Sequence, residues 1–556
     1  MSKEAAKQAG WRMVAIAAIG AAGLIGTGAV PWPDNDRLFT VYQNIQVFGR
    51  VYKEIATNYV DAVDPEKFMQ AGIAGMLGTL DPYTSYIARE DGDEVDLLTT
   101  GKYGGIGVTI GVRDGQVQII SVMDGYSAQR AGIQAGDVIL KVDSVDVGEK
   151  KAEEVRNLAR GEAGSEVRLT VRREGESAPL DFVLIREEIQ VKNVTYAGYV
   201  EPGIGYIRLE RFSRKAGEEV RQAIRDLRGN GELKGLILDL RGNPGGLLDA
   251  AVDVVSKFVP RGSVVVTTKG RRSETDKSYS SAEEPLAPTL PLVVLTDEGS
   301  ASASEIVAGS LQDMDRAVLV GTRTFGKGLV QTIVPLEYGA QLKITTARYY
   351  TPSGRSIQEI DYMHRDRSGV FLVTPDSLRH EFRTKGGRKV RDAGGVMPDS
   401  VVLDEDPGPY VRELYRRALF FKFSNRYIAE RRGAPMAGAD RDAMESFRKF
   451  LEAEKFDYRE DADTKVAELQ KLGEQSHYSE DVRENMERLV ASLERERKRG
   501  FDRYRDHIQE ALAVELMGRA KGEQGRIEAS FGHDEQLKVA KEVLKNPRLY
   551  TRKLSS

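Results

Sequence analysis

The sequence contains no cysteine, so disulfide bonds, thiolate nucleophiles and cysteine-ligated metals are excluded. Histidine is scarce too, with five residues that all lie in the last two-fifths of the chain: His364, His380, His477, His507 and His533. The sequence therefore disfavours a catalytic mechanism that needs several histidines close together. An excess of basic charge is also lacking, because 81 Lys and Arg stand against 85 Asp and Glu. This balance disfavours a nucleic-acid partner, and the sequence predicts neither a metal nor a cofactor.

Long hydrophobic runs are absent except at the N-terminus, where Met13–Val30 follows Lys3, Lys7 and Arg12. A charged segment followed by an apolar one is typical of export signals. The run is slightly shorter than the roughly 20 residues that span a bilayer, and Thr27-Gly28-Ala29 offers small residues for cleavage. Residues 1–33 are thus a signal peptide or a membrane anchor. Both readings predict a periplasmic or cell-envelope protein, in the second case held in the inner membrane.

The remaining 523 residues divide by pattern into four regions, which is consistent with three or four domains of roughly 150 residues. Residues 34–95 show helical periodicity, and residues 96–190 form short β-branched runs between glycine turns. Residues 191–405 alternate strands and helices, which predicts a layered α/β domain. Residues 406–556 are charged and helical. This extension is interpreted either as a solvated appendage or as an arm that binds a partner or a second copy.

Ser302 is the candidate nucleophile. It follows the apolar strand predicted at Leu292–Thr296 and precedes a helix that begins near Ala303. Backbone N–H groups at a helix start can stabilise an oxyanion, and the small neighbours Ala301 and Ala303 let a substrate backbone approach. A serine in this position is also the usual N-cap of a helix, so the segment alone does not decide between the two roles.

Lys327 is the candidate base, because a serine hydroxyl needs one and the α/β region has no histidine before His364. A lysine with its ordinary pKa of about 10.4 is protonated, but burial can lower that pKa far enough for general-base work. Gln331 lies on the same face of the following strand and could orient the amine without adding charge. The alternative is an ordinary surface lysine in a hairpin.

Asp239–Gly246 is a glycine-rich loop between a predicted strand and a helix. Its backbone N–H groups suit an oxyanion or a phosphate, yet it lacks the Gly-Lys-Ser/Thr ending of a P-loop. Taken alone, the loop is as well explained by a structural turn.

These segments together resemble the C-terminal processing peptidases, a family of serine peptidases that carry a PDZ domain. The resemblance covers roughly residues 40–402 and rests on six motifs in order: LDPYTSY (80–86), DLRGNPGG (239–246), GSASASE (299–305), TFGKGLVQ (324–331), TPSGRSIQ (351–358) and GGVMPD (394–399).

The resemblance implies a catalytic dyad of Ser302 and Lys327 with Gln331 positioning the lysine. It implies an oxyanion hole from the N–H of Ala303 and one from Gly245 or Gly246, with the choice between the glycines left open. It further implies an α/β fold related to crotonase and Clp-type peptidases, and catalysis without metal or cofactor.

Residues 102–108 look like a PDZ carboxylate-binding loop, in which Gly105, Ile106 and Gly107 present N–H groups to a C-terminal carboxylate. The alternative is a small β-barrel without a ligand. In the family this module is implied to bind substrate C-termini.

The sequence therefore predicts an exported serine endopeptidase that cleaves polypeptides near their C-termini. Two other functions were weighed: a PDZ scaffold on a catalytically dead peptidase fold, and a structural envelope protein that acts through its C-terminal helices. The natural substrate and the oligomeric state are not readable from the sequence.

Overall fold

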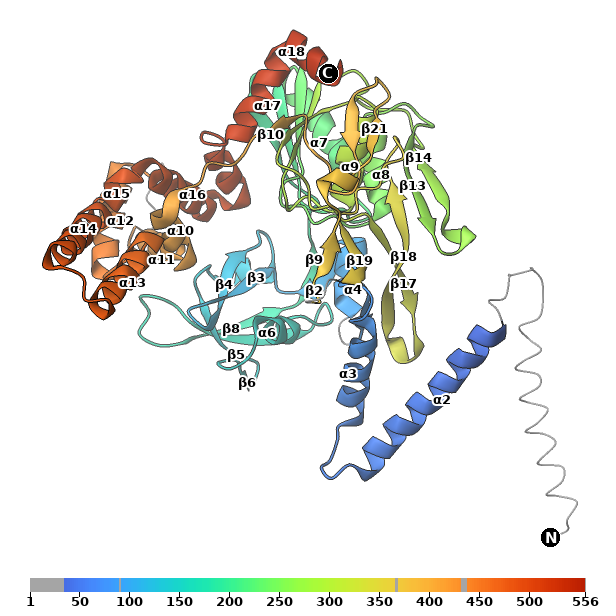
Figure 1. Cartoon of the computed structure of the whole chain (residues 1–556), viewed down its shortest axis with the longest axis horizontal. Coiled ribbons are helices and arrows are strands. Elements are labelled where there is room, and N and C mark those ends of the chain that lie inside the picture. The colour runs from blue at the N-terminus through green and yellow to red at the C-terminus, as the bar shows by residue number, and fades with distance from the viewer. Residues whose placement is uncertain (1–34, 90–91, 366–368, 432–437, 556) are drawn as a thin grey trace, which may run out of the picture. The chain divides into compact units, whose positions relative to one another are not determined.

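A computed structural model describes residues 35–89, 92–365, 369–431 and 438–555 (Figure 1). The apolar run Met13–Val30 lies outside these ranges. Among the helices that are described, none is both long and apolar enough to cross a bilayer. The chain divides into two compact units, residues 1–79 and 80–556.

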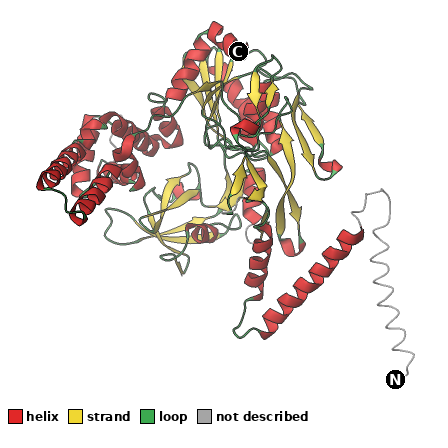
Figure 2. Cartoon of the chain, viewed as in Figure 1, coloured by secondary structure: helices red, strands yellow, loops and turns green. Residues whose placement is uncertain are grey.

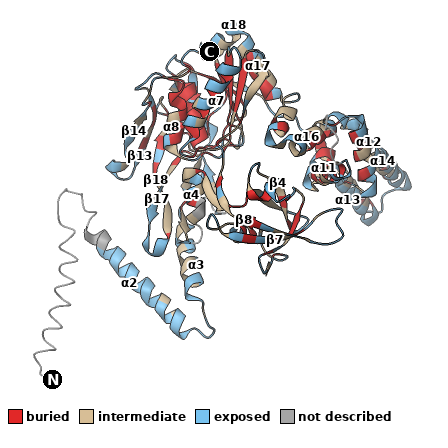
Figure 3. Ribbon diagram, turned by 180° about the vertical axis from the view of Figure 1, so that it is seen from behind, coloured by how far each residue is buried: buried red, intermediate tan, exposed pale blue. Residues whose placement is uncertain are grey.

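The first unit contains α2 (Asn35–Asn58) and α3 (Pro65–Leu77), where helical periodicity was predicted. Asp64 caps α3 by accepting from two backbone N–H groups of its first turn. Tyr52 and Phe68 stack with their ring centroids 5.6 Å apart, which joins the two helices. Most of α2 is coloured as exposed (Figure 3). Its exposed large apolar side chains include Phe39, Tyr42 and Ile45.

The second unit begins with β1 (Ser85–Ile87) and α4 (Gly92–Thr100) and continues into a β-rich module of residues 102–190. In this module β2 (Lys102–Gly105) pairs with β9 (Glu187–Gln190). The other strands form one antiparallel sheet, in the order β3-β4-β5-β7-β8, with the short β6 (Val145–Asp146) beside β5. Their bounds are Val108–Arg113, Gln116–Val122, Val138–Val142, Glu166–Arg172 and Leu180–Ile185, and the module's helices are α5 (Ser127–Arg130) and α6 (Ala152–Ala159).

A six-stranded sheet forms the centre of the α/β core, in the order β10-β11-β12-β15-β16-β23. It is parallel except for the β10 edge. Every residue of β12 and β15 is buried, as expected for parallel strands covered on both faces. The strands run Val194–Glu201, Ile204–Leu209, Gly235–Asp239, Leu292–Thr296, Val318–Gly321 and Ser400–Val401.

The two faces of this sheet are covered by different parts of the chain. On one face pack α7 (Ala216–Asn230), α8 (Leu248–Ser256) and α9 (Ala303–Asp313), which lie between the strands in sequence. On the other face pack α17 (Glu535–Lys545) and α18 (Pro547–Ser555) from the end of the chain. The extension past residue 405 is thus not one appendage, because α17 and α18 pack on the central sheet of the α/β core.

A second sheet joins β1 to β18 (Gln341–Tyr350), β13 (Val264–Gly270) and β14 (Lys277–Ser280), with β17 (Leu329–Pro335) also paired to β18. Two short hairpins follow in sequence. They are β19 (Ile360–Arg365) with β20 (Phe371–Val373), and β21 (Glu381–Arg383) with β22 (Lys389–Arg391).

The rest of the C-terminal region is helical (Figure 2) and has its own apolar core of residues from 410 to 516. Its helices are α10 (Gly408–Arg416), α11 (Leu419–Glu430), α12 (Arg441–Ala453), α13 (Asp461–Gln475), α14 (Glu480–Lys498), α15 (Gly500–Arg503) and α16 (Arg505–Ser530). The layered α/β core, the β-rich module and the helical ends agree with the predicted fold class.

Candidate active site

Ser302 stands at the turn between β15 and α9, as predicted, with a strained backbone. Its φ of 56° and ψ of −109° are rarely adopted by a residue with a side chain. Such strain persists only where the surroundings enforce it, and it is concentrated at functional sites. The neighbouring hydroxyls have structural roles, because Ser300 donates to the carbonyl of Leu240 and Ser304 to that of Asn243. These two bonds fasten the serine turn to the glycine-rich loop.

Lys327 precedes β17 and presents a buried amine. Burial lowers the pKa of Lys327 to about 8, and the nearby charge of Lys343 acts in the same direction. Asp81 and Glu305 oppose that shift by favouring the charged form. The amine lies 4.0 Å from the centroid of the Tyr83 ring. Within the described ranges no hydrogen bond joins it to the hydroxyl of Ser302.

Glu305 connects the two loops that carry Ser302 and Lys327. Its carboxylate is fully buried on α9, and one oxygen, Oε2, accepts from the backbone N–H of Ser302 at 2.8 Å and of Lys327 at 2.9 Å. The other oxygen accepts from the hydroxyl of Thr324 at 2.6 Å and the N–H of Gly326 at 2.8 Å. Residues 25 positions apart in sequence thus share one hydrogen-bond acceptor.

Burial raises the pKa of Glu305 to about 7, while its four hydrogen-bond donors act against the rise. All four donors point at carboxylate oxygens, so the ionised form satisfies them best. Sequence reasoning missed this residue. A glutamate three positions after a serine is the capping-box pattern, and that spacing was the signal available.

Tyr349, buried on β18, reinforces the same junction. Its hydroxyl lies 3.0 Å from the carbonyl oxygen of Ser302 and 2.6 Å from that of Lys327. The backbones on both sides of the pair are therefore held by groups from α9 and β18.

Gln331 lies on β17, two strand positions beyond Leu329. Its side-chain amide donates to the Thr345 hydroxyl at 3.2 Å. No hydrogen bond to Lys327 is formed among the described residues, so the orienting role assigned to Gln331 stays a prediction.

Gly245 lies against the turn that carries Ser302. A Cβ added there would come within 2.7 Å of the Ala301 carbonyl oxygen and 2.9 Å of both the Ala303 nitrogen and the Ser302 Cβ. Gly246 instead lies against Phe212, whose carbonyl oxygen would be 2.4 Å from an added Cβ. The N–H of Gly245 donates to the Asn243 side chain. In the described chain the N–H groups of Ala303 and Gly246 have no acceptor.

Gly105, Ile106 and Gly107 connect β2 to β3 in the β-rich module. Gly105 pairs with Glu187, and the Ile106 side chain is buried in the module's core. Gly107 has a φ of 81°, and an added Cβ would meet the Tyr126 Cβ at 2.4 Å, so the close approach and the backbone conformation both require glycine. The helix α6 packs against β3 beside this segment.

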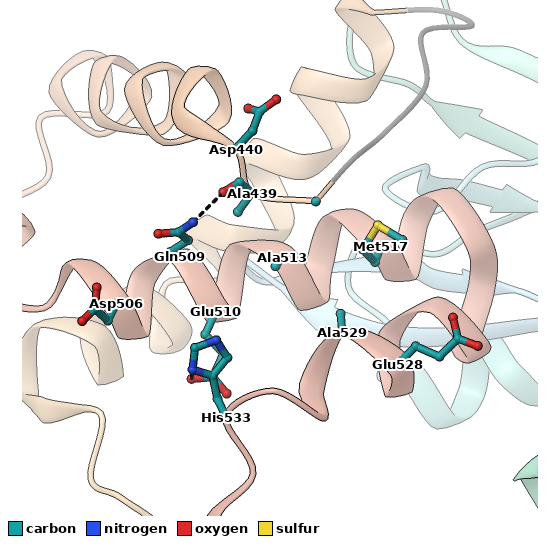
Figure 4. Close-up of a pocket in the computed structure, with 11 residues that line it drawn as sticks. Ala439, Asp440, Asp506, Gln509, Glu510, Ala513, Met517, Glu528, Ala529 and His533 are labelled. Carbon is teal, nitrogen blue, oxygen red and sulfur yellow. Dashed lines mark hydrogen bonds and ion pairs between the residues drawn. The ribbon is translucent and has the colours of Figure 1, made fainter. Parts of the chain in front are cut away.

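A cavity of about 660 Å³ lies away from these residues, in the C-terminal helical region (Figure 4). It is lined by α16, by the start of α12 and by the turn at His533. Gln509 spans part of it by donating to the carbonyl of Ala439. Its charged lining includes Asp506 and Glu510 but neither Ser302 nor Lys327, so it does not supply the serine chemistry.

Comparisons with known proteins agree with the residue pattern. Residues 203–366 match the model of peptidase family S41, and residues 118–173 match a PDZ domain. Residues 410–544 match the "probable PDZ-protease, C-terminal helical domain", and residues 33–91 match the "activating protease CtpB N-terminal domain".

Relatives with assigned names point the same way. A carboxy-terminal-processing protease of Bartonella bacilliformis is 41% identical over 322 residues, which are 57% of this chain and 74% of that protein. A carboxyl-terminal-processing protease of Synechocystis is 39% identical over 297 residues, 52% of this chain and 69% of that protein. The solved photosystem II D1 C-terminal processing protease aligns over 60% of this chain and 92% of its own at 30% identity, with a TM-score of 0.34. The chain belongs to the carboxy-terminal-processing proteases of peptidase family S41, which are serine-type endopeptidases with a PDZ domain.

Proposed function

We propose that this protease cleaves polypeptides near their C-termini with Ser302 as nucleophile and Lys327 as general base. The observation that carries the proposal is the shared acceptor, because Ser302 and Lys327 both donate a backbone N–H to Oε2 of Glu305. Burial lowers the pKa of the Lys327 amine to about 8. A lysine tuned to that range is a competent base near neutral pH.

In the proposed reaction the neutral amine of Lys327 takes the proton of the Ser302 hydroxyl as its oxygen attacks the scissile carbonyl. The resulting ammonium returns that proton to the leaving amine, and an acyl-enzyme remains. Water then loses a proton to Lys327 and attacks the ester, and the released serine oxygen takes the proton back. Each proton gained by the lysine is thus given up within the cycle.

The N–H of Ala303 is proposed to stabilise the oxyanion, because it has no acceptor among the described residues and begins a helix. Of the two glycines, Gly246 has the free N–H, whereas Gly245 lies closer to Ser302 but donates to Asn243. This favours Gly246 as the second donor.

The β-rich module is proposed to bind the substrate's C-terminal carboxylate at Gly105, Ile106 and Gly107. Support comes from the PDZ match at residues 118–173 and from the positive φ of Gly107 beside a strand edge. The N-terminal segment is proposed to export the protein to the cell envelope. Self-association through the helical ends stays a prediction.

Ser302→Ala and Lys327→Ala test the dyad. Both variants are expected to lose cleavage of an unstructured protein such as casein while they keep the circular dichroism spectrum of the parent. Lys234→Ala is the matched control, because Lys234 is an exposed lysine of the same domain with 67% of its side chain accessible. Full activity of Lys327→Ala would exclude the proposed base, and the catalytically dead scaffold predicts equal, absent activity in all variants.

C-terminal recognition is tested with one peptide in two forms, a free carboxylate and a C-terminal amide. The amide removes the charge that the N–H groups of the carboxylate loop would bind. We expect the amide to be cleaved at least tenfold less efficiently at low substrate concentration. Equal kcat/KM for the two forms would show that recognition lies elsewhere in the substrate.

A further inference from the structure

The amine of Lys327 is placed on an aromatic ring. Its Nζ lies 4.0 Å from the centroid of Tyr83, which is a close cation–π distance. Within the described ranges the amine forms no hydrogen bond and no ion pair. The charged amine of Lys327 therefore has its direct polar contact with the face of the Tyr83 ring.

The Tyr83 ring is itself fixed by its surroundings. Its hydroxyl lies 3.1 Å from that of Tyr362, and the two rings meet edge to face with centroids 5.7 Å apart. Its N–H donates to Asp81 at 2.9 Å, which closes a tight turn. Two residues further on, Ser85 pairs with Lys343 in the second sheet. These contacts fix the orientation of the Tyr83 ring, and the Lys327 amine lies over its face.

The charged groups around the amine are few. Lys343 on β18 disfavours the ammonium, whereas Asp81 in the turn and Glu305 on α9 favour it. Tyr83 is neutral at physiological pH, since burial and the hydrogen bond with Tyr362 raise the pKa of Tyr83 well above its ordinary value. The ring therefore acts through its negative face and not through a phenolate.

We propose that Tyr83 is a positioning residue for the lysine: its ring holds the protonated amine out of hydrogen-bonding contact with Ser302, and the amine leaves the ring when it loses its proton. This inference rests on the proposed Ser302–Lys327 dyad and adds to it a resting position for the base.

The attraction between ring and amine exists only for the charged form. The neutral amine gains nothing from the ring and is free to accept a hydrogen bond from the serine hydroxyl. Since the backbone of Lys327 is held at both its N–H and its carbonyl, this change needs only rotation of the side chain. Deprotonation and alignment of the base are then one coupled step.

Tyr83→Leu and Tyr83→Phe separate the ring from the hydroxyl. Leucine keeps an apolar contact but removes the π-face, so the charged amine loses stabilisation and its pKa falls. We expect the acid limb of the kcat/KM profile to move to lower pH by roughly 0.5–1.5 units in Tyr83→Leu. Tyr83→Phe retains the aromatic ring face. We expect its kcat/KM profile to have its acid limb at the same pH as that of the parent enzyme, even if its maximal rate differs. A Tyr83→Leu limb that matches that of Tyr83→Phe, or lies above it, overturns the proposal.

A second measurement needs no change at Tyr83 and no catalysis. In Ser302→Ala protein labelled with ¹³C-lysine, the ε-methylene protons of Lys327 over the ring should resonate upfield, because of the ring current. Lys327→Ala identifies the resonance. We expect the upfield shift to disappear as the pH rises through about 8, the pKa of Lys327. A shift that is absent, or that stays constant through the titration, contradicts the inference.

These results also separate the inference from the function on which it rests. If Ser302→Ala and Lys327→Ala retain cleavage, the dyad is wrong. If both are inactive but the leucine and phenylalanine variants share one acid limb, the dyad stands and only the role of Tyr83 fails.

Discussion

At the scale of single residues, Glu305 joins the backbones of Ser302 and Lys327 through its carboxylate. Each of its oxygens accepts two hydrogen bonds, and Oε2 accepts from both Ser302 and Lys327. A carboxylate can accept at all four places, whereas an amide must turn an NH₂ group toward one pair of donors. The site therefore requires a carboxylate and not merely a polar side chain of this length.

Glu305→Gln is expected to lower kcat/KM at least tenfold and to destabilise the fold, since it loses two hydrogen bonds to a charged acceptor, roughly 1.5–3 kcal/mol each. Steady-state cleavage and urea unfolding measure the two effects. Ser310→Ala is the matched control on the same helix, because its buried hydroxyl donates to Val265. That variant should lose about 1 kcal/mol of stability with unchanged kcat. A Glu305→Gln enzyme with parental kcat/KM would disprove the positioning role.

The acid limb of the reaction should report the titration of Lys327. Burial lowers its pKa to about 8, and the base works only when neutral. Activity should thus rise with pH through about 8 and fall roughly tenfold for each unit below it.

Lys343→Ala tests the contribution of the neighbouring charge. Lys343 disfavours the ammonium of Lys327, so its removal raises the pKa and should move the acid limb to higher pH. Lys234→Ala, an exposed lysine elsewhere in the domain, should leave the limb in place. A limb that moves to lower pH in Lys343→Ala would contradict the electrostatic assignment.

At the scale of elements, the loop after β12 and the turn before α9 fit together without space for a side chain. Gly245 has a φ of 100° and would bring a Cβ within 2.7 Å of the Ala301 carbonyl. Gly262, in a turn before β13, has a similar φ of 85° but open space around the missing Cβ. The two glycines share a positive φ, which would strain any residue with a side chain, and they differ in what lies beside them.

Gly245→Ala is therefore expected to lose activity by two orders of magnitude or more, because the loop must shift away from Ser302. Gly262→Ala should only destabilise, by roughly 1–2 kcal/mol for a side chain in left-handed backbone, with kcat unchanged. Thermal unfolding and casein cleavage of both variants test this. Equal activity of the two variants would show that the close contact at Gly245 is not needed for catalysis.

At the scale of the whole molecule, the C-terminal helices α17 and α18 complete the apolar core on one face of the central sheet. Leu537, Ala540 and Val543 are buried with strand residues such as Val293 and Val318. The hydroxyl of Tyr550 accepts the N–H of Leu292 at 3.0 Å, at the start of the strand that leads to Ser302. Arg241 in the glycine-rich loop bonds Asp534 at 2.7 Å. The C-terminal segment therefore contacts the glycine-rich loop through Asp534 and the start of β15 through Tyr550.

Removal of α17 and α18 is thus expected to expose the sheet and prevent stable folding. A truncation at residue 405 would remove the same support, so it cannot isolate a role of the helical arm. Leu537→Ala is the sharper test and should cost about 2–5 kcal/mol in urea unfolding. Leu472→Ala on α13 is the control, since that leucine is 53% exposed and its loss should change stability by about 0.5 kcal/mol or less. Similar losses for both leucines would refute the core role of α17.

Much of the fold could be read from sequence, because the signals are local. The strand–turn–helix around Ser302 follows from an apolar run, small residues and a helical stripe, and the α/β alternation predicts buried parallel strands. The position of α17 could not be read in the same way. Its sparse apolar stripe of Leu537, Ala540 and Val543 is equally consistent with a solvent-exposed arm and with a core helix. Only the contact with the central sheet shows that α17 is part of the core.

The sequence by itself determined the chemical groups: a serine at a helix start, a lysine between glycines, and no cysteine or nearby histidine to compete with them. Tertiary structure alone decided their state. Burial lowers the pKa of Lys327 to about 8, Glu305 and Tyr349 hold the two backbones together, and the Tyr83 ring lies 4.0 Å from the amine. These effects depend on solvent exclusion and on contacts between segments far apart in the chain, which no local pattern of residues encodes.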